Sequence, residues 1–195
     1  MQKLLAWMVC LAASLCLPEV QAADAGFEEL FNGRDFSGWR CSLQKTGDPW
    51  PDNWKVKDGV IYLTGLMRPH LVTTRTFTDF EVKFEWRALT PKFNGGFYIR
   101  TKPDAGNNQI RVDRNYEGAF LAGNLTGAKA VPMLQKAIGE WNEWRVVVKG
   151  TSATLWCNGK QAWEATGLVP ASGHIGIQAE GTPMEFRNLQ VRELR

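Results

Sequence analysis

The stretch FEVKFEWRAL, Phe80 to Leu89, alternates apolar and charged residues along its length. Successive side chains of a β-strand point to opposite faces, so Val82, Phe84 and Trp86 share one face. The other face carries the charged residues Glu81, Lys83, Glu85 and Arg87. This pattern predicts a strand that buries its apolar face in a core, and it sets the fold class for the rest of the chain.

Turn signals recur between short segments rich in Val, Ile, Phe and Trp. WKVKDGVIYLTG and ATLWCNGKQAWEA place Asp58-Gly59 and Asn158-Gly159 between alternating segments, which is typical of β-hairpins. A third hairpin is predicted to turn at 150–152. Further strand candidates are Gly96–Thr101, Gln109–Asp113, Ala119–Leu121, Gly173–Glu180 and Glu185–Leu194. No segment after the first residues has a helical period, so we predict an all-β antiparallel sandwich or barrel.

The first residues are typical of an export signal. Lys3 precedes an apolar run from Leu4 to Leu17, and small residues precede a cleavage point after Ala22. The run is short for a membrane span, although an uncleaved anchor is the alternative. We expect a signal peptide at 1–22, one domain at 23–195 without a stable membrane span, and a periplasmic or secreted protein.

The charge distribution bears on nucleic-acid binding, and the cysteine content bears on disulfide formation. The chain has 23 Lys and Arg against 20 Asp and Glu, a net charge of +3, and the basic residues are scattered. We therefore expect no nucleic-acid partner. Cys41 and Cys157 are the only cysteines after residue 22, and an oxidising compartment predicts a disulfide between them. Two buried thiols are the alternative.

One short stretch carries a polar row. In QIRVD, Gln109, Arg111 and Asp113 share a face, opposite Ile110 and Val112. Three other predicted strands pair an apolar face with a polar one, and their polar residues include Glu85, Arg87, Arg100, Gln178 and Glu180. Arginine beside carboxylates and amides suits hydroxylated ligands, so the rows predict a shared binding surface. An ordinary solvated sheet face is the alternative. The neighbouring glycines Gly95, Gly96 and Gly176 are expected to give a ligand room at the backbone.

Two tryptophans and two histidines complete the candidates. Trp50 and Trp54 lie in the loop segment TGDPWPDNW, where an indole can stack on a pyranose ring or pack onto the sandwich. His70 and His174 are the only histidines, and no Asp-rich calcium loop or Ser-His-Asp signature is present. We therefore expect no metal and no cofactor, and the sequence carries no signature of an oligomeric state.

The order of motifs resembles one known family. FEELFNGRDFSGWR, WKVKDGVIYLTG, LVTTRTFTDFEVKFEWRAL, NGGFYIR, GAFLAG, GEWNEWRVVVKG, LWCNGKQ and GHIGIQAEGTPMEFRNLQVREL follow one another as in the 3-keto-disaccharide hydrolase family, from Phe27 to Leu194. The resemblance implies a concanavalin-like jelly roll of two antiparallel sheets, with a saccharide site on the concave face. It also implies an exported bacterial protein that acts on sugars oxidised to a ketone at C3.

The resemblance implies a particular chemistry as well. The C3 ketone acidifies the C2 hydrogen, so a protein base removes it while donors hold the enolate. The aglycone then leaves C1 by elimination, and water adds to the product. Such a site needs a base and an oxyanion partner rather than the carboxylate pair of ordinary glycosidases.

Several positions carry over from the family motifs. Asn94-Gly95-Gly96 matches the family's Asn-Ser-Gly, and Arg100, Glu85 and Arg87 match its charged strand positions. The family's Glu-x-Gln-x-x-Asp becomes Gln109-Ile-Arg111-Val-Asp113, and Glu180 stands where His is common. We predict Asp113 or Glu180 as the base and Arg111 as the oxyanion partner. Predicted substrate contacts are Glu85, Arg87, Asn94, Arg100, Gln109, Gln178, Trp50 and Trp54.

Three functions are compatible with these residues. The chain is predicted to be an enzyme that cleaves keto-sugar glycosides, with a saccharide as its partner. A non-catalytic carbohydrate-binding module that uses the same face is the alternative. A domain that binds protein through an exposed sheet is the third.

Overall fold

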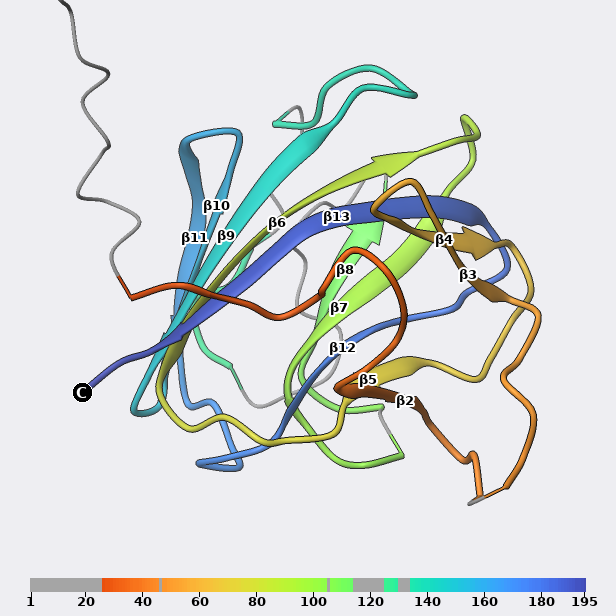
Figure 1. Cartoon of the computed structure of the whole chain (residues 1–195). Helices are drawn as coiled ribbons and strands as arrows, with labels where there is room; N and C mark the ends of the chain where they lie inside the picture. Colours follow the sequence, from red (N-terminus) through yellow and green to blue (C-terminus); the bar gives the residue numbers. More distant parts are fainter. Residues whose placement is uncertain (1–25, 46, 105, 114–124, 130–133) are drawn as a thin grey trace, which may run out of the picture.

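The computed structural model describes residues 26–45, 47–104, 106–113, 125–129 and 134–195. Within these ranges every regular element is a strand, so no helix is available that could cross a membrane. The strands form two antiparallel sheets packed face to face (Figure 1). The predicted all-β sandwich of jelly-roll type is therefore confirmed.

The larger sheet has eight strands and includes the long central strands seen across Figure 1. In pairing order these are β11 (Lys160–Thr166), β10 (Ser152–Cys157), β9 (Asn142–Lys149), β6 (Phe80–Ala88), β13 (Pro183–Glu193), β4 (Val60–Thr64) and β3 (Trp54–Lys57), with β1 (Glu28–Glu29) beside β13. The smaller sheet contains β2 (Trp39–Cys41), β5 (Leu71–Thr73), β12 (His174–Ile177), β7 (Asn94–Thr101) and β8 (Gln109–Asp113).

The three predicted hairpins are present. Asp58 and Gly59 join β3 to β4 with φ values of 52° and 78°, and Asn158 and Gly159 join β10 to β11 with 50° and 77°. Positive φ at both central residues is typical of the two-residue hairpin turn whose twist matches that of the flanking strands. Asp, Asn and Gly adopt this conformation readily. β9 and β10 are joined across Gly150, also as predicted.

Three short strands were not predicted. β1, β2 and β5 contain two or three residues each, too few for alternation to be visible. All three residues of β5 are buried, so this strand has no polar face to reveal it. The predicted strand Ala119–Leu121 and the signal segment 1–22 lie outside the described residues.

The predicted core residues are buried between the sheets. Val82, Phe84, Trp86, Ile110, Val112, Ile175 and Ile177 all belong to one hydrophobic cluster. Phe84 of β6 stacks on Phe97 of β7 with ring centroids 4.2 Å apart, which joins the two sheets at their centre. Burying such a side chain stabilises a fold by roughly 1.5–3 kcal/mol, so this packing fixes which face of each sheet points outward.

Candidate active site

The polar row of β8 lies on the outer face of the five-stranded sheet. Ile110 and Val112 are in the core, so alternation turns Gln109, Arg111 and Asp113 away from it. Gln109 and Asp113 are nevertheless only 8% exposed. Neighbouring groups therefore cover much of this row.

Gln109 connects β8 to the segment after β12. Its Nε2 donates to Gln178 Oε1 at 2.5 Å. A Cβ on Gly96 would lie 2.3 Å from the same nitrogen, so glycine lets the amide cross β7. A Cβ on Gly176 would lie 2.7 Å from the carbonyl oxygen of Leu71. The expectation that these two glycines leave room for a ligand is wrong, because neighbouring groups of the protein fill that space.

Arg111 and Asp113 form an ion pair within the row. Arg111 Nη2 lies 2.7 Å from Asp113 Oδ2. Asn94, on the neighbouring strand, is opposite Asp113 in the β7–β8 ladder. The Thr182 hydroxyl donates to the Asn94 carbonyl at 2.7 Å and accepts from its N–H at 3.1 Å, which holds the start of β7. A guanidinium held by a carboxylate has a defined position from which to meet an anionic oxygen.

Tyr98 completes the surface between β12 and β8. It points away from the core, opposite to Phe97, yet it is only 1% exposed. Burial raises the pKa of Tyr98, and the nearby Glu180 carboxylate raises it further. The hydroxyl therefore stays protonated at neutral pH and can donate a hydrogen bond. Alternation placed this residue on the polar face, but nothing in the sequence marked it as a site residue.

His70 lies against Tyr98, with ring centroids 5.5 Å apart. Burial, together with the positive charge of Arg68, lowers the pKa of His70 to about 4. The backbone N–H of Ala179 donates to Nδ1 at 3.1 Å, so the neutral ring carries its proton on Nε2. At neutral pH His70 is thus a hydrogen-bond donor. No local pattern in the sequence marks His70 as a site residue, because its partners Tyr98 and Ala179 lie far along the chain.

Glu180 lies where the 66–70 segment, which we call the strap, meets the end of β12. Met67 and Glu180 form an isolated β-bridge, and Arg68 N donates to the carbonyl of Ala179 at 3.4 Å. Glu180 is half-buried, and its charge acts on Tyr98. The structure therefore brings together six predicted residues, namely Asn94, Gln109, Arg111, Asp113, Gln178 and Glu180, and adds Tyr98 and His70.

Glu85 and Arg87 do not belong to this surface. Their strand, β6, pairs with β9 and β13 in the eight-stranded sheet, so both side chains lie on the opposite outside of the sandwich. Burial raises the pKa of Glu85, but hydrogen bonds from Arg187 and Asn188 outweigh it and hold the pKa below its usual value. Arg87 pairs with Glu185. The prediction that they share a site with the β8 row is wrong, because alternation does not reveal which sheet a strand joins.

The prediction that Arg100 contacts the substrate is also wrong. It has a φ of 45°, which takes its side chain off the regular strand pattern, and it is 0% exposed. Its guanidinium donates to the Thr78 and Gly150 carbonyls, each at 2.6 Å, and to Asp79 Oδ1 at 2.8 Å. Arg100 is a structural residue at the end of the sandwich.

The two loop tryptophans differ in environment. Trp54 is buried and its indole donates to the Pro69 carbonyl at 2.8 Å, so its predicted contact with a substrate is wrong and packing is correct. Trp50 is 37% exposed and stacks on Phe36, with ring centroids 4.5 Å apart. One indole face of Trp50 is thus already covered by the protein.

The predicted disulfide is not formed. Cys41 lies on β2 of the smaller sheet, and Cys157 lies on β10, on the opposite side of the molecule in Figure 1. Both residues are buried thiols, and burial raises the pKa of Cys41 to about 12. The two cysteines lie too far apart in the fold to form a bridge, and their separation cannot be read from the sequence.

Among the described residues no three His, Cys, Asp or Glu side chains lie together as a metal site would require.

Comparisons with known proteins agree with this architecture. A family model described as a 3-keto-alpha-glucoside-1,2-lyase-like domain matches residues 26–192. The 3-keto-disaccharide hydrolase of Bacteroides thetaiotaomicron is 26% identical, over 87% of this chain and 79% of that protein.

Solved structures share the fold at lower identity. A proposed glycosyl hydrolase from Parabacteroides distasonis superimposes with a TM-score of 0.70 at 20% identity, covering 89% of this chain and 96% of that one. The Bacillus licheniformis β-glucanase gives a TM-score of 0.58 at 13% identity, covering 87% and 97%. The match over most of its length shows that the chain belongs to the 3-keto-alpha-glucoside-1,2-lyase-like domain family.

Proposed function

We propose that this protein cleaves glycosides that carry a ketone at C3, by removing the C2 proton, eliminating the aglycone and hydrating the product. The observation that carries the proposal is the cluster of polar side chains on the outer face of the five-stranded sheet. It combines an available carboxylate, a held guanidinium and two neutral donors. Family membership and the name of the Bacteroides relative support the same chemistry.

Glu180 is assigned as the base. Among the described residues it forms no ion pair, whereas the Asp113 carboxylate is engaged by Arg111 at 2.7 Å. A base that takes a proton from carbon needs an oxygen lone pair that no cation already occupies. Asp113 is then the residue that positions Arg111.

Arg111 is assigned to the developing enolate. When Glu180 takes the C2 proton, the electron pair moves into the C3 carbonyl and leaves negative charge on its oxygen. A preorganised guanidinium stabilises that charge, an effect that commonly contributes about 100-fold or more in rate. The enolate then reforms the ketone and expels the aglycone from C1.

Tyr98 and His70 supply the remaining hydrogen bonds. The raised pKa of Tyr98 and the lowered pKa of His70 leave one O–H and one N–H donor at neutral pH. Both can donate to the ketone oxygen or to the departing aglycone oxygen. Addition of one water to the unsaturated product completes the hydrolysis.

The test uses a purified 3-keto-disaccharide, with the released sugar followed over time. A substrate deuterated at C2 should react more slowly, because the C2–H bond breaks in the proposed step. E180Q should lose turnover by about 100-fold or more while it still binds the substrate. Glu143, exposed on the other sheet, offers the control E143Q, which should behave as wild type. Full turnover in E180Q would refute the assignment.

A carbohydrate-binding module without catalysis is the second candidate. Gln109 and Glu180 replace the Glu and His common in the family motifs, which favours this alternative. It predicts that the wild-type protein binds the 3-keto-disaccharide and releases no product. We further propose that the protein is exported after cleavage behind Ala22, which N-terminal sequencing of the mature protein tests.

A further inference from the structure

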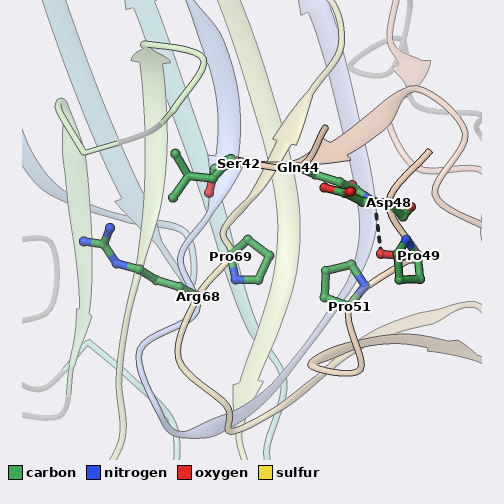
Figure 2. A pocket seen from close by; sticks show the side chains of 8 residues that line it. Ser42, Gln44, Asp48, Pro49, Pro51, Arg68 and Pro69 are labelled. Carbon is green, nitrogen blue, oxygen red and sulfur yellow. Dashed lines mark hydrogen bonds between the residues drawn. The ribbon is translucent and has the colours of Figure 1, made fainter. Parts of the chain in front are cut away.

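A cavity of about 340 Å³ lies beside the strap, which lines it with Arg68 and Pro69. The loop after β2 supplies the rest of the lining, including Ser42, Leu43, Gln44 and Asp48, and Figure 2 shows most of these residues in close view. Ser42 links the cavity directly to His70: the His70 N–H donates to Ser42 Oγ at 2.9 Å, and the Ser42 N–H donates to the His70 carbonyl at 2.7 Å. The cavity lining is therefore joined to the backbone of His70, whose ring contacts Tyr98.

Two of the polar side chains in the cavity lining, Gln44 and Asp48, bond to the backbone of their own loop. Gln44 Oε1 accepts from the Cys41 N–H, and its Nε2 donates to the Asp48 and Pro49 carbonyls, each at 3.3 Å. Asp48 Oδ2 accepts from the Lys45 N–H at 2.8 Å. Three proline rings form much of the remaining surface, and in Figure 2 the Arg68 guanidinium extends away from Pro49 and Pro51.

Exposed apolar side chains gather on the same two segments. Among the described residues six large hydrophobic side chains are exposed, and four of them lie in 43–50 or 66–67: Leu43, Trp50, Leu66 and Met67. Leu43 is 67% exposed and Met67 is 63% exposed. Such a concentration beside a cavity marks a surface that an apolar group can cover.

The backbone holds two of these lining residues in an unfavourable conformation. Leu43 has a φ of 65° and Arg68 a φ of 41°, in the left-handed region that non-glycine residues avoid. Such conformations are energetically unfavourable and are found more often at ligand sites.

We propose that this cavity binds an apolar aglycone, so that the substrates are 3-keto-glycosides of alkyl or aromatic alcohols rather than disaccharides. The inference rests on the proposed function and deepens it. The aglycone leaves from C1, next to the C2 proton that Glu180 takes, and the strap joins that position to the cavity. A second sugar would bring hydroxyl groups that need partners, whereas Gln44 Nε2 and Asp48 Oδ2 already bond to the backbone.

The experiment compares methyl, butyl and hexyl 3-keto-α-glucosides with a 3-keto-disaccharide. The alkyl alcohols leave with similar intrinsic ease, so differences in kcat/KM report binding of the chain. The wild-type kcat/KM should rise about fourfold for each methylene that the cavity buries. L43N removes the apolar side chain and keeps a residue that tolerates positive φ, and it should lower the hexyl-to-methyl ratio of kcat/KM about tenfold. V169T, at an exposed apolar residue elsewhere, should keep the wild-type ratio.

A second measurement separates this inference from the proposed function. Calorimetry should show hexyl α-glucoside binding more tightly than methyl α-glucoside, with the difference reduced in L43N but not in V169T. If no 3-keto-glycoside turns over but this difference is found, the proposed function fails and the apolar cavity stands. If the disaccharide is the better substrate and chain length affects neither kcat/KM nor binding, the aglycone inference is overturned. A loss of affinity common to L43N and V169T would also overturn it.

Discussion

Two arginines of the predicted site, Arg100 and Arg111, should differ in effect when each is changed to methionine. R100M should lower stability, whereas R111M should lower the catalytic rate. Arg100 is 0% exposed and its guanidinium makes four hydrogen bonds, at 2.6, 2.6, 2.8 and 3.5 Å. R100M keeps the length of the side chain but leaves the Thr78 and Gly150 carbonyls and the Asp79 carboxylate without this donor. We expect loss of stability without direct loss of catalytic chemistry.

The size of the effect follows from these contacts. A hydrogen bond to a charged group contributes about 1.5–3 kcal/mol. Because the Asp79 side chain is 28% exposed, water replaces part of what it loses. We therefore expect R100M to lower the free energy of unfolding by about 3–4 kcal/mol. With a urea slope of about 2 kcal/mol/M, the unfolding midpoint falls by roughly 1.5–2 M.

Urea unfolding and steady-state kinetics on the same samples provide the assay. R111M is the matched variant, because Arg111 lies on the outer face with 26% of its side chain exposed. It should cost about 1 kcal/mol of stability or less and lower kcat about 100-fold. If R100M unfolded at the wild-type urea concentration, or if it raised KM while R111M left kcat unchanged, the reassignment of Arg100 would be incorrect.

Three further predictions concern stability and the thiols. The pKa of His70 is lowered from 6.5 to about 4, so its stabilising contribution is complete above pH 6.5 and is lost as the pH falls toward 4. At about 1.4 kcal/mol per pKa unit the loss reaches up to about 3 kcal/mol, and urea unfolding of H70Q should show a correspondingly weaker pH dependence over this window. Both buried thiols, Cys41 and Cys157, should react with a thiol reagent only after unfolding, and a reductant should leave the melting temperature unchanged; one disulfide per chain by mass spectrometry would contradict this. F84A removes the ring that stacks on Phe97 and should cost about 3–5 kcal/mol in chemical denaturation, whereas a cost below about 1 kcal/mol would show that the sheets are not joined there.

Much of the fold was readable because strand alternation and turn chemistry are local. The period of two in FEVKFEWRAL and QIRVD sorted Phe84 and Ile110 into the core and Arg111 onto the outer face, and the structure agrees. Asp-Gly and Asn-Gly marked two hairpins because these residues adopt positive φ readily. Short strands such as β5 escaped notice because three buried residues contain no period.

The candidate site was only partly readable, since a site depends on which strands become neighbours. Alternation showed that Glu85, Arg100 and Arg111 each leave the apolar face of a strand. It did not show that β6 joins the other sheet, or that a positive φ turns Arg100 under the end of the sandwich. His70 had no local pattern at all.

The sequence by itself determined the fold class, the core register and the polar row of β8, because these follow from backbone geometry within a few residues. Only the tertiary structure decided that Tyr98 and His70 join that row, that Glu85 lies on the opposite side, and that Cys41 and Cys157 remain apart. The physical reason is that burial, pKa and ligand access depend on contacts between segments distant in the chain. Here the strap shows this most directly, because its pairing with Glu180 and with Ser42 brings the proposed base, a neutral histidine and an apolar cavity together.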